Sequence, residues 1–106
     1  MAFVIKQNDT SPAVQASLKV ANGNAVNLSG ATVKFLMKSL DGVLKVNTNM
    51  TVSNAGAGTV NYNWQTGDTD TAGSYFVEFQ VTFADGTIET FPNSKNLNIS
   101  ITPDLG

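Results

Sequence analysis

The feature that most constrains the fold is a strict alternation of apolar and polar residues, which recurs along most of the chain. The longest run places apolar side chains at every second position from Tyr75 to Phe83. Successive side chains of a β-strand point to opposite faces, so this run predicts the central strand of a sheet with one buried face. Shorter runs of the same kind cover residues 14–20, 33–37, 60–64 and 97–101. No segment has the 3.6-residue period of an amphipathic helix, and the one helix-like piece is a single turn at 65–71 with Thr66 as its cap.

Turn signals separate these runs. Asn22-Gly23, Asp41-Gly42 and Asp85-Gly86 are dipeptides that tolerate the positive φ angles of a tight hairpin, and Pro103 ends the last run because it has no N–H for a ladder. Seven to nine short strands joined in this way predict an all-β fold, a β-sandwich in which residues 1–106 form a single domain.

A local pattern refines the expected sandwich. Tyr75 stands two residues after Gly73 at the start of the central strand. Immunoglobulin-like sandwiches have a tyrosine corner at this place, in which the hydroxyl group bonds to a backbone group a few residues upstream. We therefore predict an immunoglobulin-like antiparallel β-sandwich, with Gly73 and Tyr75 at the corner and the hydroxyl bonded near Asp70. Tyr75 and Trp64 are expected to be core aromatics with locally satisfied polar atoms, the alternative being a stacking platform for a sugar.

Composition excludes several kinds of chemistry. The 106 residues include no Cys and no His, which removes thiol and imidazole catalysis and the usual zinc sites. Asp68, Asp70 and Asp85 could offer oxygens to a hard cation such as Ca²⁺, but turn chemistry explains them more simply. Glu78 and Glu89 are expected to lie near one another on an outer sheet face, which supplies no cleft for acid/base hydrolysis. We assign no catalytic, cofactor-binding or metal-ligating residue.

Charge and hydropathy limit the partners. Six lysines spread through a chain of net charge −2 form no basic stripe, so nucleic acid is not an expected partner. No apolar run approaches the length of a membrane span, and the first residues lack the pattern of a secretory signal, so we expect no membrane association.

Three apolar residues fall out of phase with the core positions of their strands: Val4, Leu36 and Phe76. Charged residues make up only 13% of the chain, and Asn, Thr and Ser replace them. Charged groups are costly to desolvate in an interface, so this pattern favours a domain that packs against copies of itself or against neighbours in a large assembly. The sequence thus predicts an interface that includes some of these three residues.

Four segments in order resemble a known family: residues 3–10, 26–38, 58–75 and 79–92. They are similar to the N-terminal domain of bacteriophage baseplate upper proteins, and the resemblance covers nearly the whole chain. The resemblance implies an immunoglobulin-like sandwich that is a structural part of a phage virion and docks on other virion proteins. Together with the composition and the surface pattern above, it leads us to expect a non-enzymatic virion component that is made in the host cytoplasm and is homo-oligomeric in the particle.

The resemblance leaves the position in the virion open. Family members often continue into a long helical or fibrous region, whereas this chain stops at Gly106, as a trimmed piece or a small stand-alone protein would. Tail baseplate, neck, tail tube and capsid decoration therefore all remain expected locations. The alternative function is a module that binds carbohydrate, such as a host-surface glycan, or a host receptor. Such a module needs an aromatic ring exposed in a loop, and the candidate rings all stand in strand phase: Tyr62, Trp64, Tyr75, Phe79 and Phe83.

Overall fold

Nine strands and no helix form among the residues that the computed structural model describes, which are 2–11, 13–20, 23–91 and 97–103. The strands are β1 (Ala2–Lys6), β2 (Val14–Ser17), β3 (Thr32–Ser39), β4 (Leu44–Asn49), β5 (Thr51–Asn54), β6 (Thr59–Tyr62), β7 (Gly73–Thr82), β8 (Ile88–Phe91) and β9 (Leu97–Thr102). The prediction of an all-β sandwich with seven to nine strands is confirmed. Within the described part, no helix could cross a membrane.

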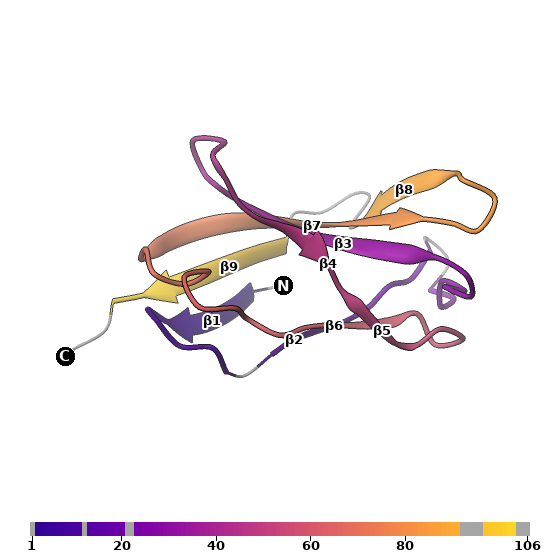
Figure 1. The fold of residues 1–106 in the computed structure, drawn as a ribbon, viewed down its shortest axis with the longest axis horizontal. Helices are drawn as coiled ribbons and strands as arrows, with labels where there is room; N and C mark the ends of the chain where they lie inside the picture. The colour runs from indigo at the N-terminus through magenta and orange to yellow at the C-terminus, as the bar shows by residue number, and fades with distance from the viewer. Residues whose placement is uncertain (1, 12, 21–22, 92–96, 104–106) are drawn as a thin grey trace.

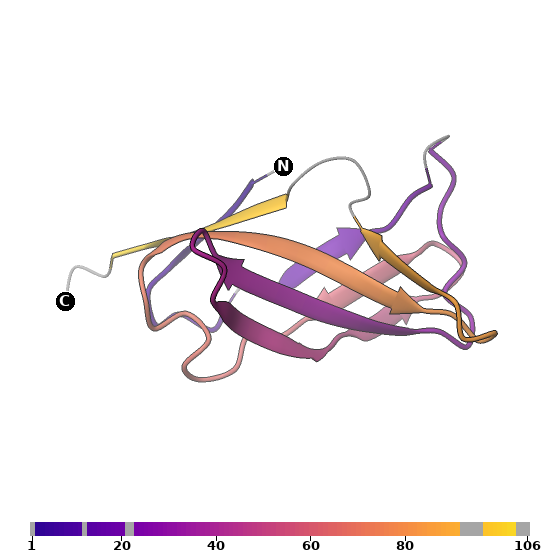
Figure 2. The same ribbon diagram turned by 90° about the horizontal axis from the view of Figure 1, so that it is seen from above.

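The strands form two packed layers (Figure 1). The large sheet has the order β1-β9-β7-β3-β4, and the small sheet has the order β2-β6-β5. The central position predicted for the Tyr75 run is confirmed, because β7 pairs with β3 along one side and with both β9 and β8 along the other. Figure 2 shows β9 and β8 against opposite ends of this long strand.

One ladder departs from the antiparallel pattern that the sequence predicts. β1 runs parallel to β9, whereas the other ladders of the described strands are antiparallel. Because β1 and β9 run in the same direction, both strands end at the same end of the large sheet. The chain passes from that end of β1 to the small sheet. The Gln7 N–H, which donates to the Thr102 carbonyl oxygen at 2.8 Å, extends the parallel pairing to that crossing point. β1 and the polar strand β5 were not expected from the alternation.

The hairpin turns have a common geometry. The Gly42 N–H donates to the carbonyl of Ser39, and the Gly86 N–H donates to the carbonyl of Phe83, both at 2.9 Å. Each glycine has a positive φ angle, 92° and 88°, as predicted for these positions. These are three-residue loops in which glycine takes the left-handed position. Gly23 has the same conformation, with φ of 89°, while Asn22 lies outside the described residues.

The predicted helical turn at 65–71 is wrong. This segment is a series of turns, and Gly67 has a φ of 95°, which no right-handed helix accommodates. The Gln65 N–H donates to the carboxylate of Asp68 at 2.9 Å, which holds the first part of this loop. The Thr69 hydroxyl donates to the carbonyl of Asp9 at 2.7 Å and ties this loop to the N-terminal segment.

Aromatic rings from both sheets form the centre of the core. Phe35 of the large sheet is fully buried and stacks on Tyr62 of the small sheet, with ring centroids 4.6 Å apart. Trp64 meets both rings edge-on, at 5.8 and 5.5 Å. Its buried indole N–H has no hydrogen-bond partner among the described residues, so the expectation of a locally satisfied ring is wrong for Trp64. The indole packs among the rings of Phe3, Phe35 and Tyr62, and the Tyr62 hydroxyl, the one polar group of these three side chains, is bonded to Asp68.

We expect Phe35→Ala to lower the free energy of unfolding by about 3–5 kcal/mol, because it removes the ring that contacts both sheets and leaves a cavity. Val4→Ala is the matched control, since Val4 is 62% exposed and its truncation should change stability by less than about 0.5 kcal/mol. Urea unfolding of the two variants measures both values. Equal stability of the two variants would contradict the central role of Phe35.

Candidate functional site

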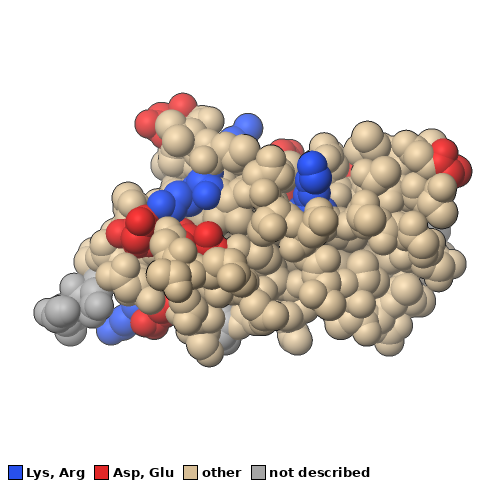
Figure 3. Space-filling view, in the orientation of Figure 1, with Lys and Arg blue, Asp and Glu red and all other residues tan. Residues whose placement is uncertain are grey.

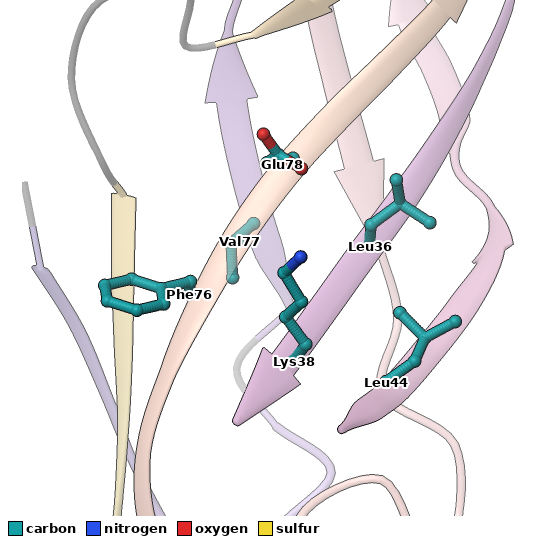
Figure 4. A pocket seen from close by; sticks show the side chains of 6 residues that line it. All are labelled: Leu36, Lys38, Leu44, Phe76, Val77 and Glu78. Atoms are coloured by element: carbon teal, nitrogen blue, oxygen red, sulfur yellow. The ribbon is translucent and has the colours of Figure 1, made fainter. Parts of the chain in front are cut away.

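A groove of about 190 Å³ opens on the outer face of the large sheet (Figure 4). It lies over β3, β4 and β7, the strands that supply its lining. The lining residues are Leu36, Lys38, Leu44, Phe76, Val77 and Glu78.

The register of β3 and β7 brings two of the predicted interface residues to this groove. Leu36 lies opposite Glu78, and Lys38 lies opposite Phe76. Opposite residues of an antiparallel pair share a face, so all four project outward. Leu36 and Phe76 are half-buried there, while Lys38 and Glu78 are exposed.

Val4, the third predicted interface residue, lies elsewhere on the sheet. It is 62% exposed on β1, opposite Ser100 of β9, and β9 separates it from β7. Val4 does not line the groove.

Leu44 completes the apolar wall of the groove, and the alternation alone does not predict its position. Leu44 and Val46 would share a face in a regular strand. Here Met37 pairs with Val46 and Lys38 pairs with Leu44, so Lys45 is an extra residue that forms a β-bulge. As a result Val46 is buried in the core, whereas Leu44 is 51% exposed on the outer face.

The hairpin between β3 and β4 rises above the outer face beside the groove (Figure 1). Its loop carries Leu40 and Val43, each 63% exposed. The alternation of the strands did not identify these two residues as surface apolar residues. Their positions on either side of the Asp41-Gly42 turn were the sequence signal that could have done so. Ser39 holds the loop, because its hydroxyl bonds the Asp41 carboxylate and accepts from the Val43 N–H at 3.2 Å. The structure therefore presents these apolar side chains on a fixed hairpin.

The loop that precedes β7 contains the predicted corner residues. The Tyr75 hydroxyl donates to the carbonyl oxygen of Thr71 at 2.6 Å, and the ring is buried. Gly73 has a φ of 148°, a conformation that residues with a side chain rarely adopt. The role of this bond as a structural corner stays a prediction, which is given a test below.

A second tyrosine anchors the same loop from the small sheet. The Tyr62 hydroxyl donates to the carboxylate of Asp68, which also accepts from the Gln65 N–H at 2.9 Å. Burial raises the pKa of Tyr62 far above its ordinary value of 10.0, and the hydrogen bond to Asp68 and the negative charge of that group raise it further.

The aspartates considered as cation ligands have local partners. Asp70 forms an ion pair with Lys45 at 2.5 Å, and this bond, followed by that from Thr71, lowers the pKa of Asp70. The Thr87 hydroxyl and N–H bond Asp85 and lower its pKa in the same way. In the described segments, no group of three or more acidic residues is placed to hold a metal ion.

The expected closeness of Glu78 and Glu89 is wrong. Glu89 lies opposite the buried Val81, on the inward-facing side of β8, whereas Glu78 lies opposite Leu36 on the outer face. The three-residue loop after Phe83 sets this register, so the two carboxylates belong to opposite faces of the sheet.

Charged side chains are sparse on the surface shown in Figure 3. Residues 46–67, which include β5 and β6, contain no charged residue at all. In that view the part of the surface over these two strands has no charged side chain, whereas the charges gather toward the β3–β4 hairpin and the loop before β7.

The sequence matches the model of the BppU N-terminal domain, the N-terminal domain of the baseplate upper protein, over residues 3–105. The chain belongs to this family. The BppU N-terminal domain is a structural domain of phage baseplates, so the resemblance found in the sequence is confirmed and the chain is a virion component.

A solved structure supports the fold of this BppU N-terminal domain. CopC from Methylosinus trichosporium OB3b is similar with a TM-score of 0.56 and 16% sequence identity, over 99% of this chain and 87% of that chain. A likeness at this level of identity shows the fold alone. No curated protein matches the sequence.

Tyr75→Phe is expected to lower the free energy of unfolding by about 1 kcal/mol, because it removes one partly buried hydrogen bond without changing the ring. Ser74→Ala is the neighbouring control, since Ser74 is exposed. Thermal or urea unfolding measures the difference, and an unchanged midpoint in Tyr75→Phe would show that the Thr71 bond contributes nothing.

The Tyr62 environment predicts a loss of stability at alkaline pH. The folded state keeps the Tyr62 proton above the ordinary pKa of 10.0, whereas the unfolded state releases it there. The stabilisation is therefore fully present below pH 10 and is lost as the pH rises above that value. Urea unfolding of the native protein should show a steeper decline above pH 10 than that of Tyr62→Phe, and identical slopes would contradict this assignment.

Proposed function

We propose that this domain is a non-enzymatic adaptor of the phage tail baseplate, and that the outer face of its large sheet docks on neighbouring subunits of the virion, either copies of itself or other virion proteins. Residues 1–106 act as one module in this proposal. Membership of the baseplate family favours the baseplate over the neck, the tail tube or the capsid surface.

The observation that carries the proposal is that Leu36, Leu44 and Phe76 all line one groove of the outer face, with the Phe76 ring on the side of β9 (Figure 4). Leu40 and Val43 are further exposed apolar residues on the adjoining hairpin. Apolar side chains on an outer sheet face favour a protein contact there, and a partner that covers the groove must also pair the two charged lining residues, Lys38 and Glu78.

The rigidity of the scaffold supports the same proposal. The groove is formed by β3 and β7, which pair over eight positions from Thr32–Thr82 to Ser39–Tyr75. A site built on paired strands loses little conformational entropy when a partner binds. Val4, on the edge strand β1, is proposed to make a separate contact, because it lies outside the groove.

The positions of the aromatic rings favour docking over the alternative of glycan binding. Tyr62, Trp64, Tyr75 and Phe79 are buried. Phe3, Phe76 and Phe83 are half-buried, so no described aromatic ring is fully available as a stacking platform.

Phe76→Asp should fold but fail to enter virions, because a partner would have to desolvate the new carboxylate. Phage that lacks the gene can be complemented in trans with each variant, and the copy number in purified particles measures incorporation. Gln15→Asp is the matched control, since it places the same charge at an exposed position of the small sheet and should be incorporated normally.

Leu44→Asp provides a second variant with less risk to folding, because Leu44 is 51% exposed. Circular dichroism and thermal unfolding establish which purified variants are folded. Normal copy numbers of folded Phe76→Asp and Leu44→Asp in particles would show that this face is not the docking surface.

A further inference from the structure

The four outward residues at the centre of the groove have a self-complementary arrangement. Leu36 faces Glu78 and Lys38 faces Phe76 across neighbouring strands, so the four side chains mark the corners of a quadrilateral. The apolar side chains occupy one diagonal, and the opposite charges occupy the other. Figure 4 shows Lys38 and Glu78 both over the groove, and no ion pair joins them in the described part of the chain.

This arrangement matches itself after a two-fold rotation. The axis of this rotation lies in the plane of the outer face and passes through Leu36 and Phe76. A half-turn about it exchanges the positions of Lys38 and Glu78. A second copy placed face to face then sets its Glu78 over Lys38 and its Lys38 over Glu78, while the apolar side chains meet along the axis. Two-fold interfaces use one patch on both subunits, so they require this kind of self-complementarity.

The implied packing is also sterically reasonable. The diagonal axis is inclined to the strands, so the strands of the two copies cross at a steep angle. Orthogonal crossing is one of the two common ways in which β-sheets pack face to face. A partner that carried a single sign of charge would leave either Lys38 or Glu78 unpaired at the centre of the contact, which disfavours such a partner.

We propose that the outer face of the large sheet binds a second copy of this chain through a two-fold contact with reciprocal Lys38–Glu78 ion pairs. This inference rests on the proposed function, because it names the partner of the same face. It predicts a dimer in solution and a strict dependence of that dimer on the signs of the two charges.

Charge reversal tests the proposal. Analytical ultracentrifugation of the native protein should show a dimer, and Lys38→Glu or Glu78→Lys alone should weaken dimerisation by on the order of tenfold, because each reversal creates two like-charge contacts. The double variant should dimerise like the native protein. An equimolar mixture of the two single variants should also dimerise, because the pairs Glu–Lys and Lys–Glu are restored between unlike chains.

Lys34→Glu is the matched control. Lys34 projects from the same face of β3, one step beyond Leu36, and the two-fold rotation places it over the neutral Asn47 of the second copy. The same change of charge there should have a much smaller effect on dimerisation. A monomeric native protein, or single reversals at Lys38 and Glu78 no more harmful than Lys34→Glu, would overturn the proposal.

The particle assay separates this inference from the proposed function. If Phe76→Asp fails to enter virions while Lys38→Glu enters normally, the face docks on a different virion protein, and the second-copy proposal is overturned alone. If the charge-reversal series behaves as expected in solution but Phe76→Asp is incorporated normally, the two-fold contact stands and virion docking through this face is overturned.

Discussion

Stacking between Phe35 and Tyr62 is the contact on which the rest of the structure depends, because it joins the two sheets at the centre of the sandwich. Trp64, two residues beyond the end of β6, meets both rings edge-on. A domain of this size buries a modest core, so three large rings supply much of the apolar area that holds its layers together. Phe35 also fixes the phase of β3: once its ring points inward, Leu36 must point outward to the groove.

The same cluster reaches the surface through hydrogen bonds. Tyr62 bonds Asp68 in the loop before β7, and Tyr75 bonds Thr71 a few residues further along that loop. The next contact of this loop is the ion pair between Asp70 and Lys45. Since Lys45 is the extra residue of the β4 bulge, the loop contacts the irregularity that turns Leu44 toward the groove. The core, the loop before β7 and the proposed docking face are thus connected by a short series of contacts.

The groove combines few features, and each has a clear physical role. In the proposed contact, the half-buried apolar side chains would provide the surface that gains from being covered, and the two exposed charges would orient the partner. Their diagonal arrangement follows from the pairing register of β3 and β7 alone. In the proposed two-fold contact, this self-complementary face would join two copies of the domain.

The sequence by itself determined the strand class, the central place of β7, the glycine turns and the buried phase of the aromatic rings, because all of these follow from local alternation and backbone preference. The sequence also showed that Leu36 and Phe76 are out of phase with the core positions of their strands, and therefore that they face outward. Only the tertiary structure decided that these two residues share a groove while Val4 stands apart, since that depends on which strands pair. Three further features depend on how separate segments pair: the parallel ladder of β1, the opposite faces of Glu78 and Glu89, and the outward position of Leu44 at a bulge. The periodicity of a single strand does not reveal which residue of another strand lies opposite it.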